Sequence, residues 1–234
     1  MRAYVVFNGI SDADIGVFME ELPSFARGKR ITKGDTLPGR HGRAVYDQGG
    51  YDTYTTTMKV NCNGRSRNDV FAWLSGEGWL TTSDEPELMA WVDFYPQQKN
   101  KRFNCQGCYD TLTISMTVYP MRRLVDEEPM TFSEAALFDG KGVEKTDPVI
   151  CINGAGDVDL MINDCAVVLT GLTQPLYLDC DAGIAYVETN GVKEFAGEKV
   201  TLVNGWPTLL IGENMINWSG TVASVIIQPN WRFY

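Results

Sequence analysis

The sequence has almost none of the residues and motifs from which catalytic or membrane functions are usually inferred. Its 234 residues contain a single histidine, His41, and no GxGxxG, phosphate-loop or HExxH motif. No apolar run approaches the roughly 18 to 20 residues that cross a bilayer, and the apolar run at the start is too short for a signal peptide. These absences argue against an enzyme and against a membrane protein. They predict a chain that is made and folded in the cytosol.

Basic residues are scarce as well. The 30 aspartates and glutamates outnumber the 20 lysines and arginines, which gives a formal net charge of −10. A protein that binds DNA or RNA stably normally presents a basic face to the phosphates, so we expect no specific nucleic-acid binding. An acidic surface is still compatible with a passage through which DNA moves without adhering.

The cysteines are scattered through the chain rather than gathered as a ligand set. Without a secretory signal, we expect them to be reduced and buried as small apolar residues. Cys105 and Cys108 have the spacing of zinc ligands, but no second ligand pair lies nearby in the sequence. Cys62 and His41 could in principle complete such a site. The favoured interpretation has no metal and no cofactor. The six cysteines are Cys62, Cys105, Cys108, Cys151, Cys165 and Cys180.

The patterns that are present indicate an all-β chain with one short helix. Twenty-three glycines and ten prolines interrupt many short apolar segments. Residues 111–119 alternate cleanly, with Ile114, Met116 and Val118 on one face. Residues 67–75 are the best helix candidate, with Asn68 as the cap. The charged, proline-bounded segment 120–129 predicts a boundary between domains at residues 1–124 and 125–234.

The second half shows turn signals every 8 to 12 residues, which is typical of a β-sandwich. We expect separate strands over residues 149–152, ending at Asn153-Gly154, and over residues 157–162. Near the end of the chain, apolar residues alternate on both sides of Gly212-Glu213-Asn214, which predicts a hairpin with its turn at those three residues. Residues 222–227 form the strand that follows.

Two pairs of aspartates are candidate sites. Asp157 and Asp159 lie on the same face of their predicted strand, roughly 6 to 7 Å apart, near the separation of glycosidase carboxylates. Val158 and its alternating neighbours would face the core, so the favoured interpretation is that both aspartates are solvated and structural. Asp179 to Gly183 resembles the start of a calcium loop, but Asn190 stands at the twelfth position, where the bidentate glutamate is needed.

Three tryptophans in the second half of the chain suggest sugar binding as an alternative function. Trp206, Trp218 and Trp231 could stack on a sugar ring, as aromatic residues do in lectin-like sandwiches, with Trp206 and Trp218 as the contact residues. Because they stand beside alternating apolar residues, packing in a core or interface is the favoured interpretation. His41 lies in a glycine-rich turn, a poor place for a catalytic histidine.

In order along the chain, the motifs resemble those of the distal tail protein (Dit) family of phages with long, non-contractile tails. The match covers nearly the whole sequence. In the first half, it rests on residues 7–11, Gly16, residues 22–24, 38–42, 73–76 and 113–120. In the second half, it rests on residues 148–154, 157–163, 206–209, 212–214 and 230–232.

The resemblance implies a first domain that forms a homohexameric ring and a galectin-like or carbohydrate-module-like β-sandwich outside it. It implies a structural hub in the virion, at the tail tip, with a channel for transient passage of DNA. The implied partners are the major tail tube protein, the tape-measure protein, the tail-associated lysin or tail-tip protein and receptor-binding proteins. Direct recognition of cell-wall glycans by the sandwich is the alternative. A hairpin arm that embraces the next subunit would include Leu37, Pro38, Gly39, Arg40, His41 and Gly42.

Overall fold

A computed structural model describes residues 2–36, 38–39, 41–62, 67–94, 99–101 and 111–234. Strands dominate, which confirms the prediction of an all-β chain. The chain divides into two compact units, Met1–Val125 together with Tyr234, and Asp126–Phe233. Within the described part of the chain, no helix has the length and apolar character needed to cross a bilayer.

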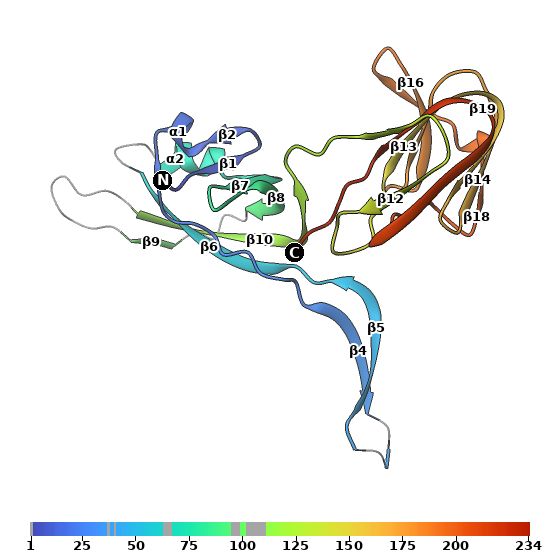
Figure 1. Cartoon of the computed structure of the whole chain (residues 1–234). Helices are drawn as coiled ribbons and strands as arrows, with labels where there is room; N and C mark the ends of the chain where they lie inside the picture. The colour runs from blue at the N-terminus through green and yellow to red at the C-terminus, as the bar shows by residue number, and fades with distance from the viewer. Residues whose placement is uncertain (1, 37, 40, 63–66, 95–98, 102–110) are drawn as a thin grey trace. The chain divides into compact units, whose positions relative to one another are not determined.

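The first unit is built on an eight-stranded antiparallel sheet in the order β2-β1-β7-β8-β10-β6-β3, with β9 beside β10 (Figure 1). Its central strand β10 buries every second residue from Leu112 to Val118, as the alternation predicts. The strands are β1 (Val5–Phe7), β2 (Ile10–Ser11), β3 (Phe18–Glu21), β6 (Tyr54–Asn61), β7 (Gly76–Thr82), β8 (Glu85–Phe94), β9 (Lys99–Lys101) and β10 (Thr111–Leu124).

Two short helices complete this unit. Helix α2 (Arg67–Trp73) occupies the predicted position, and Val70 and Trp73 join the core. Helix α1 (Asp12–Ile15) is a single helical turn. It forms because the Ser11 hydroxyl accepts from the Asp14 N–H at 3.3 Å while the Asp14 carboxylate accepts from the Ser11 N–H at 2.9 Å. This reciprocal capping stabilises a single helical turn.

Pro120, the first residue of the segment that predicts the domain boundary, lies inside a strand. Strand β10 continues through Pro120 to Leu124 and pairs with β8 on both sides of it. The pairing shifts register between Val118 and Arg122, and a proline is tolerated in a strand at such an irregularity because no ladder hydrogen bond is required there.

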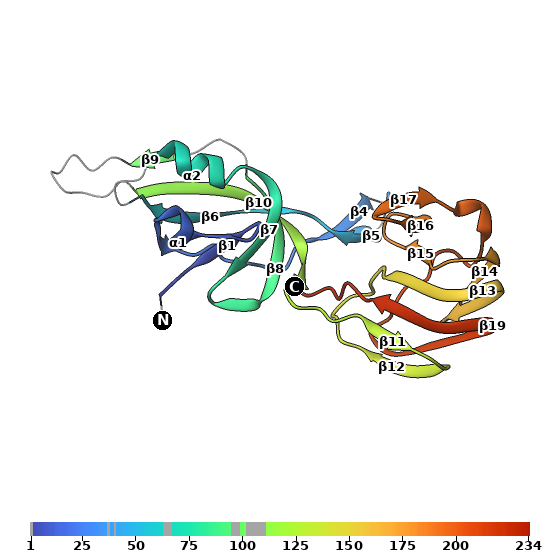
Figure 2. The same cartoon turned by 90° about the horizontal axis from the view of Figure 1, so that it is seen from above.

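The second unit is organised by two long strands, β13 (Val149–Ile162) and β19 (Gly212–Gln228). They pair with each other along most of their length, with β15, β16 and β17 beyond β13 and with β11 beyond β19 (Figure 2). The remaining elements are β11 (Met130–Phe132), β12 (Ala136–Gly140), β14 (Cys165–Leu172), β15 (Leu176–Asp179), β16 (Ile184–Thr189), β17 (Val192–Phe195), the 3₁₀ helix η1 (Gly197–Lys199) and β18 (Val200–Val203).

The expected end of a strand at Asn153-Gly154 is wrong, because β13 bends there instead of stopping. Its pairing with β19 shifts register at Asn153/Gly154 and again between Ala155 and Val158. Opposite the second shift, a Cβ at Gly220 would lie 2.4 Å from the carbonyl oxygen of Asp157, so only glycine fits. Buried residues lie on both sides of the bend in β13, at Ile150 and Ile152 before it and at Leu160 and Ile162 after it.

The expected hairpin turn at Gly212-Glu213-Asn214 is also wrong. These residues begin β19, and Asn214 is fully buried. Its side-chain oxygen accepts from the Leu210 N–H at 2.7 Å, and its amide nitrogen donates to the carbonyl oxygens of Leu210 and Gly212 at 3.1 and 2.9 Å. The residues that precede β19 therefore bond to an asparagine side chain instead of forming a first hairpin strand.

Candidate functional site

The first unit carries a hairpin that is not packed against a hydrophobic core. Strands β4 (Arg30–Thr36) and β5 (Arg43–Tyr51) form a separate two-stranded sheet and leave the central sheet as a projecting arm (Figure 1). Their pairing is antiparallel and runs from Arg30 opposite Tyr51 to Thr36 opposite Arg43. Among the described side chains of the two strands, none is buried.

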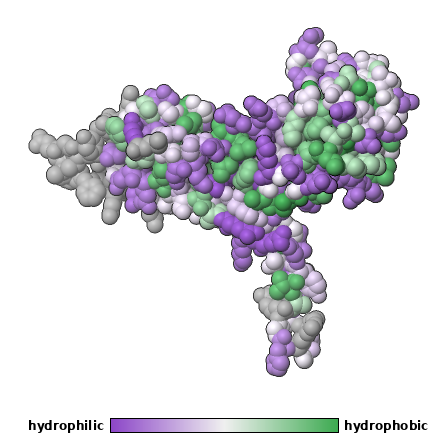
Figure 3. All heavy atoms as spheres, in the orientation of Figure 1, coloured by the Kyte–Doolittle hydropathy of each residue, from purple (hydrophilic) through white to green (hydrophobic). Residues whose placement is uncertain are grey.

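Apolar side chains lie on this exposed arm. Val45 is 63% exposed, Tyr46 56% and Ile31 40%, and Figure 3 shows hydrophobic residues on the arm between hydrophilic ones. Tyr46 pairs with Lys33 and Val45 with Gly34, so successive positions place Val45 and Tyr46 on opposite faces. A two-stranded hairpin in water is marginally stable by itself. An arm with apolar residues on both faces is a surface that gains stability when another chain covers it.

The tip of the arm is the segment that the sequence singled out. Pro38, Gly39, His41 and Gly42 are exposed, and both glycines have positive φ, 78° at Gly39 and 92° at Gly42, which L side chains rarely adopt. Leu37 and Arg40 lie outside the described residues. The described tip residues thus lie in a turn between two extended strands, and their role in assembly remains a prediction.

The root of the arm is closely packed. A Cβ at Gly28 would lie 2.4 Å from the Cβ of Pro120 and 2.9 Å from the carbonyl oxygen of Asp52. The Asp52 N–H donates to the carbonyl oxygen of Lys29 at 2.8 Å, which joins the two chain segments just below the strands. The absent side chain at Gly28 therefore allows the arm to leave the sheet at this point.

Above this root, β5 contains a bulge. Thr32 pairs with Asp47 and Arg30 with Tyr51, so three residues of β5 face one residue of β4. Gly49 and Gly50 have φ of 77° and 78°. The Asp47 carboxylate accepts from the Gly49 N–H at 2.9 Å and pairs with Arg30 at 3.1 Å. Bulges of this kind re-aim a strand, so this one sets the direction of the outer arm.

The two tryptophans of the binding alternative are both half-buried in the second unit. Trp206 is half-buried in the segment between β18 and β19, and its indole lies against Gly183. Trp218 is half-buried in β19 opposite Leu160, in the same alternation as the buried Ile216. Neither tryptophan takes part in an aromatic ring contact within the part of the chain that the structure describes. Glycan binding at these residues stays a prediction.

The acidic candidates have local structural partners. Asp157 accepts from the Gly171 N–H at 2.9 Å, and Asp159 accepts from the Ser219 hydroxyl at 3.1 Å, while Val158 between them is buried as predicted. Asp179 accepts from the Ala182 N–H at 3.0 Å, as in an Asx turn. Over the described ranges, no group of three or more His, Cys, Asp and Glu residues is placed to hold a metal ion.

The cysteines that the structure describes form no disulfide bonds. Cys62, Cys151 and Cys180 are buried and Cys165 is half-buried. Burial raises the pKa of the Cys180 thiol well above its ordinary value, and Asp147 and Asp179 raise it further. Burial also raises the pKa of Cys151. Cys105 and Cys108, the pair with zinc-ligand spacing, lie outside the described residues.

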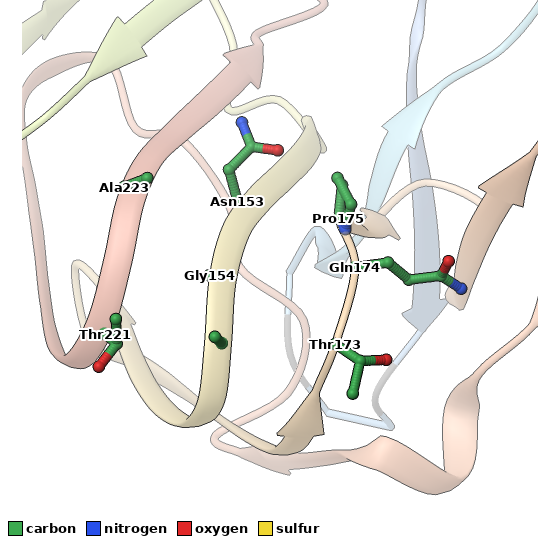
Figure 4. A pocket seen from close by; sticks show the side chains of 8 residues that line it. Asn153, Gly154, Thr173, Gln174, Pro175, Thr221 and Ala223 are labelled. Carbon is green, nitrogen blue, oxygen red and sulfur yellow. The ribbon is translucent and has the colours of Figure 1, made fainter.

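The second unit contains an open hollow of about 340 Å³ beside the bend in β13 (Figure 4). Asn153 and Gly154 of β13 and Thr221 of β19 line one side, and the segment from Thr173 to Pro175 lines the other. The Asn153 amide donates to the Ser224 hydroxyl at 2.9 Å. The lining side chains are all uncharged, so they do not indicate a ligand class.

No protein-family model matches the chain, and no curated protein matches it. A solved structure does: the crystal structure of the SPP1 Dit (gp 19.1) protein, described as a paradigm of the hub adsorption apparatus in phages that infect Gram-positive bacteria. The match has a TM-score of 0.73 at 11% sequence identity, and it covers 100% of both chains. The two chains share one fold. The fold that the sequence resemblance implies is therefore confirmed.

Sequence reasoning missed the residues that hold the root of the arm. Arg27, Tyr51 and Tyr234 are joined by hydrogen bonds across separations of 24 and 183 residues. No spacing in the sequence connects them. The closest signal is the concentration of arginine and tyrosine on both sides of the predicted arm, because these side chains combine stacking with hydrogen bonding.

Proposed function

We propose that this chain is a distal tail protein of a long, non-contractile phage tail, a structural hub that forms a homohexameric ring at the tail tip. The observation that carries the proposal is the match of the entire chain to the fold of the SPP1 Dit protein. In this role the protein has no catalytic function and needs no cofactor, and it is part of the virion.

The arm supplies the physical reason for a ring. Strands β4 and β5 bury none of their described side chains, yet they carry Ile31, Val45 and Tyr46. A second copy of the chain can cover these residues, and head-to-tail contacts that close into a ring give every arm a neighbour. In our proposal, the arm with its tip at Leu37 to Gly42 lies on the next subunit.

The ring would join the tail tube above to the tail-tip apparatus below. Its partners would be the tail tube protein, the tape-measure protein, the tail-associated lysin or tail-tip protein, and possible receptor-binding proteins. Six copies with a net charge of −10 each carry about −60 charges, and acidic residues along a channel would keep DNA from adhering to the wall as it passes.

The arm's role is tested by two matched substitutions. Val45 in the arm and Val192 in β17 are both valines on exposed hairpins, 63% and 61% exposed. If a neighbouring subunit covers the arm, Val45→Asp loses the burial of one valine and places a charge in the interface. That change costs about 1.5–3 kcal/mol per contact, or at least about tenfold in assembly affinity. Val192→Asp should leave assembly unchanged.

A shortened arm gives a stronger test. Thr32 and Asp47 are cross-strand partners, so an Asn-Gly turn in place of residues 33–46 closes the hairpin without disturbing its root. Light scattering and negative-stain imaging should show rings for the wild type and for Val192→Asp, and only small species for the shortened arm. Rings of normal size from the shortened-arm protein would refute the arm's role.

A further inference from the structure

The last residue of the sequence, Tyr234, packs at the root of the arm. Its hydroxyl lies 3.0 Å from the hydroxyl of Tyr51, and the two rings meet edge to face with centroids 5.7 Å apart. The Arg27 guanidinium donates to both hydroxyls, at 3.1 Å to Tyr51 and 2.9 Å to Tyr234. It also lies over the Tyr234 ring, 4.1 Å from the centroid. One arginine thus joins a tyrosine of the arm to the last residue of the sequence.

Tyr234 is also held from the central sheet. Nε of Arg122, in β10, donates to the Tyr234 carbonyl oxygen at 2.7 Å, and a terminal nitrogen of the same guanidinium donates to that oxygen too. The Arg122 side chain is 11% exposed and pairs with Glu85 of β8. A mostly buried guanidinium that donates to a carboxylate and to a carbonyl oxygen is held in one orientation. Tyr234 is therefore anchored at its backbone by β10 and at its side chain by the arm. We call Arg27, Tyr51, Arg122 and Tyr234 the root cluster.

The root cluster continues to the bulge that aims the arm. The Arg30 guanidinium lies over the Tyr51 ring, 5.6 Å from its centroid, and forms the ion pair with Asp47. Asp47 in turn holds the Gly49 N–H. A continuous set of contacts runs from Arg122 in β10 through Tyr234 and Tyr51 to Arg30, Asp47 and finally Gly49. Each cation–π contact or hydrogen bond of this kind contributes little free energy by itself. Removing a residue that takes part in several of them therefore weakens the contacts that remain.

We propose that Tyr234 is a positioning residue for assembly: it fixes the root of the arm, and thereby the direction in which the arm meets a neighbouring subunit. The assembly part rests on the proposed function above, whereas the effect on the arm itself does not. The arm has no described buried side chain of its own. Its order at the root therefore depends on the contacts that Tyr234 completes.

The test uses hydrogen–deuterium exchange on the full chain at a concentration where it is monomeric. The reporters are the amides of β4, β5 and Asp52, whose N–H bonds to the Lys29 carbonyl at the root. Tyr234→Ala should raise their exchange rates by about tenfold, and Tyr234→Phe, which loses only the hydroxyl, by about threefold. Amides of β7 and β8 should keep their rates and show that the sheet remains folded.

Tyr119→Ala is the matched control. Tyr119 is a tyrosine of the same unit, 39% exposed, and lies in the same strand as Arg122. It takes no part in the hydrogen bonds and ring contacts described above for the root cluster. It should leave exchange in the arm unchanged. Unchanged arm exchange in Tyr234→Ala, or an equal increase in Tyr119→Ala, would overturn the proposal.

Assembly is then measured separately. If the wild type forms rings, Tyr234→Ala should need about tenfold higher concentration to do so. If Tyr234→Ala forms rings at the same concentration as the wild type, Tyr234 has no role in assembly. If the wild type forms no rings, the proposed function fails, while the exchange result still decides whether Tyr234 fixes the arm.

Discussion

The side chains of Asn163 and Asn214, 51 residues apart, are directly hydrogen-bonded, with Asn163 Nδ2 2.9 Å from Asn214 Oδ1. Asn163 also donates to the Thr208 carbonyl oxygen at 2.9 Å and accepts from the Met215 N–H at 3.0 Å. Together the two amides satisfy the backbone of the segment that enters β19. A fully buried asparagine is stable only when its donors and acceptors are all paired, as they are here.

Asn214→Ala should therefore destabilise the second unit strongly. The change leaves the Leu210 N–H and the Gly212 carbonyl without their side-chain partner, which costs about 2–4 kcal/mol. Urea unfolding followed by tryptophan fluorescence measures it. Asn163→Ala alone should cost less, because Asn163 is half-buried, and the double variant should cost less than the sum. Additive effects would show that the two amides do not cooperate.

Gly28→Ala should disturb the arm while leaving the central sheet intact. The new methyl group would overlap the Cβ of Pro120, so the segment below β4 must shift. We expect a loss of about 1–3 kcal/mol in the first unit and faster proteolysis within the arm. Pro120→Gly removes the opposing Cβ, and combining it with Gly28→Ala should restore part of the protease resistance. If Gly28→Ala is as resistant as the wild type, the close packing at the root does not matter.

Stability should fall in alkali because of the buried thiol of Cys180. Burial raises its pKa above the ordinary value of 9.0, so the folded state keeps the proton after the unfolded chain has lost it. The stabilising contribution is complete below about pH 9 and is lost as the pH rises further, by up to about 1.4 kcal/mol per pH unit. Urea midpoints from pH 7 to 10 should fall less steeply for Cys180→Ala. An identical slope in the variant would assign the effect to other groups.

Trp206→Ala and Trp218→Ala distinguish packing from glycan recognition. Because both side chains are half-buried, each change should lower the stability of the second unit by about 1–3 kcal/mol. In a pulldown on bacterial cell walls, the two variants should bind no less than the wild type does. The opposite result, with binding lost and stability retained, would favour the carbohydrate-binding alternative.

The sequence predicts well those elements in which one face is buried. β10 is recognisable from its alternation because Ile114, Met116 and Val118 face the core. The long strands β13 and β19 are not, since Asn153-Gly154 has the sequence of a turn but is paired with β19 through a bulge. The turn at Asn214 was predicted wrongly for a related reason. A polar residue between glycine and apolar residues is typical of a solvated turn, and only the distant partner Asn163 makes its burial possible.

The candidate site was predictable in outline only. Pro38 to Gly42 has the composition of a tight turn, and strong turn signals are local. The root of the arm depends on contacts between Arg27, Tyr51 and Tyr234, which nothing local connects. The same holds for Gly28, whose importance comes from Pro120 on another strand.

The molar mass of the purified protein tests the central claim most directly. Light scattering across a range of concentrations should reach a plateau at six times the chain mass of 26.1 kDa, about 157 kDa, for the wild type and for Val192→Asp. The protein with residues 33–46 replaced by Asn-Gly should remain monomeric, with a mass somewhat below 26.1 kDa because it has twelve residues fewer. A wild type that stays monomeric at every concentration would contradict the account of this chain as a ring-forming hub.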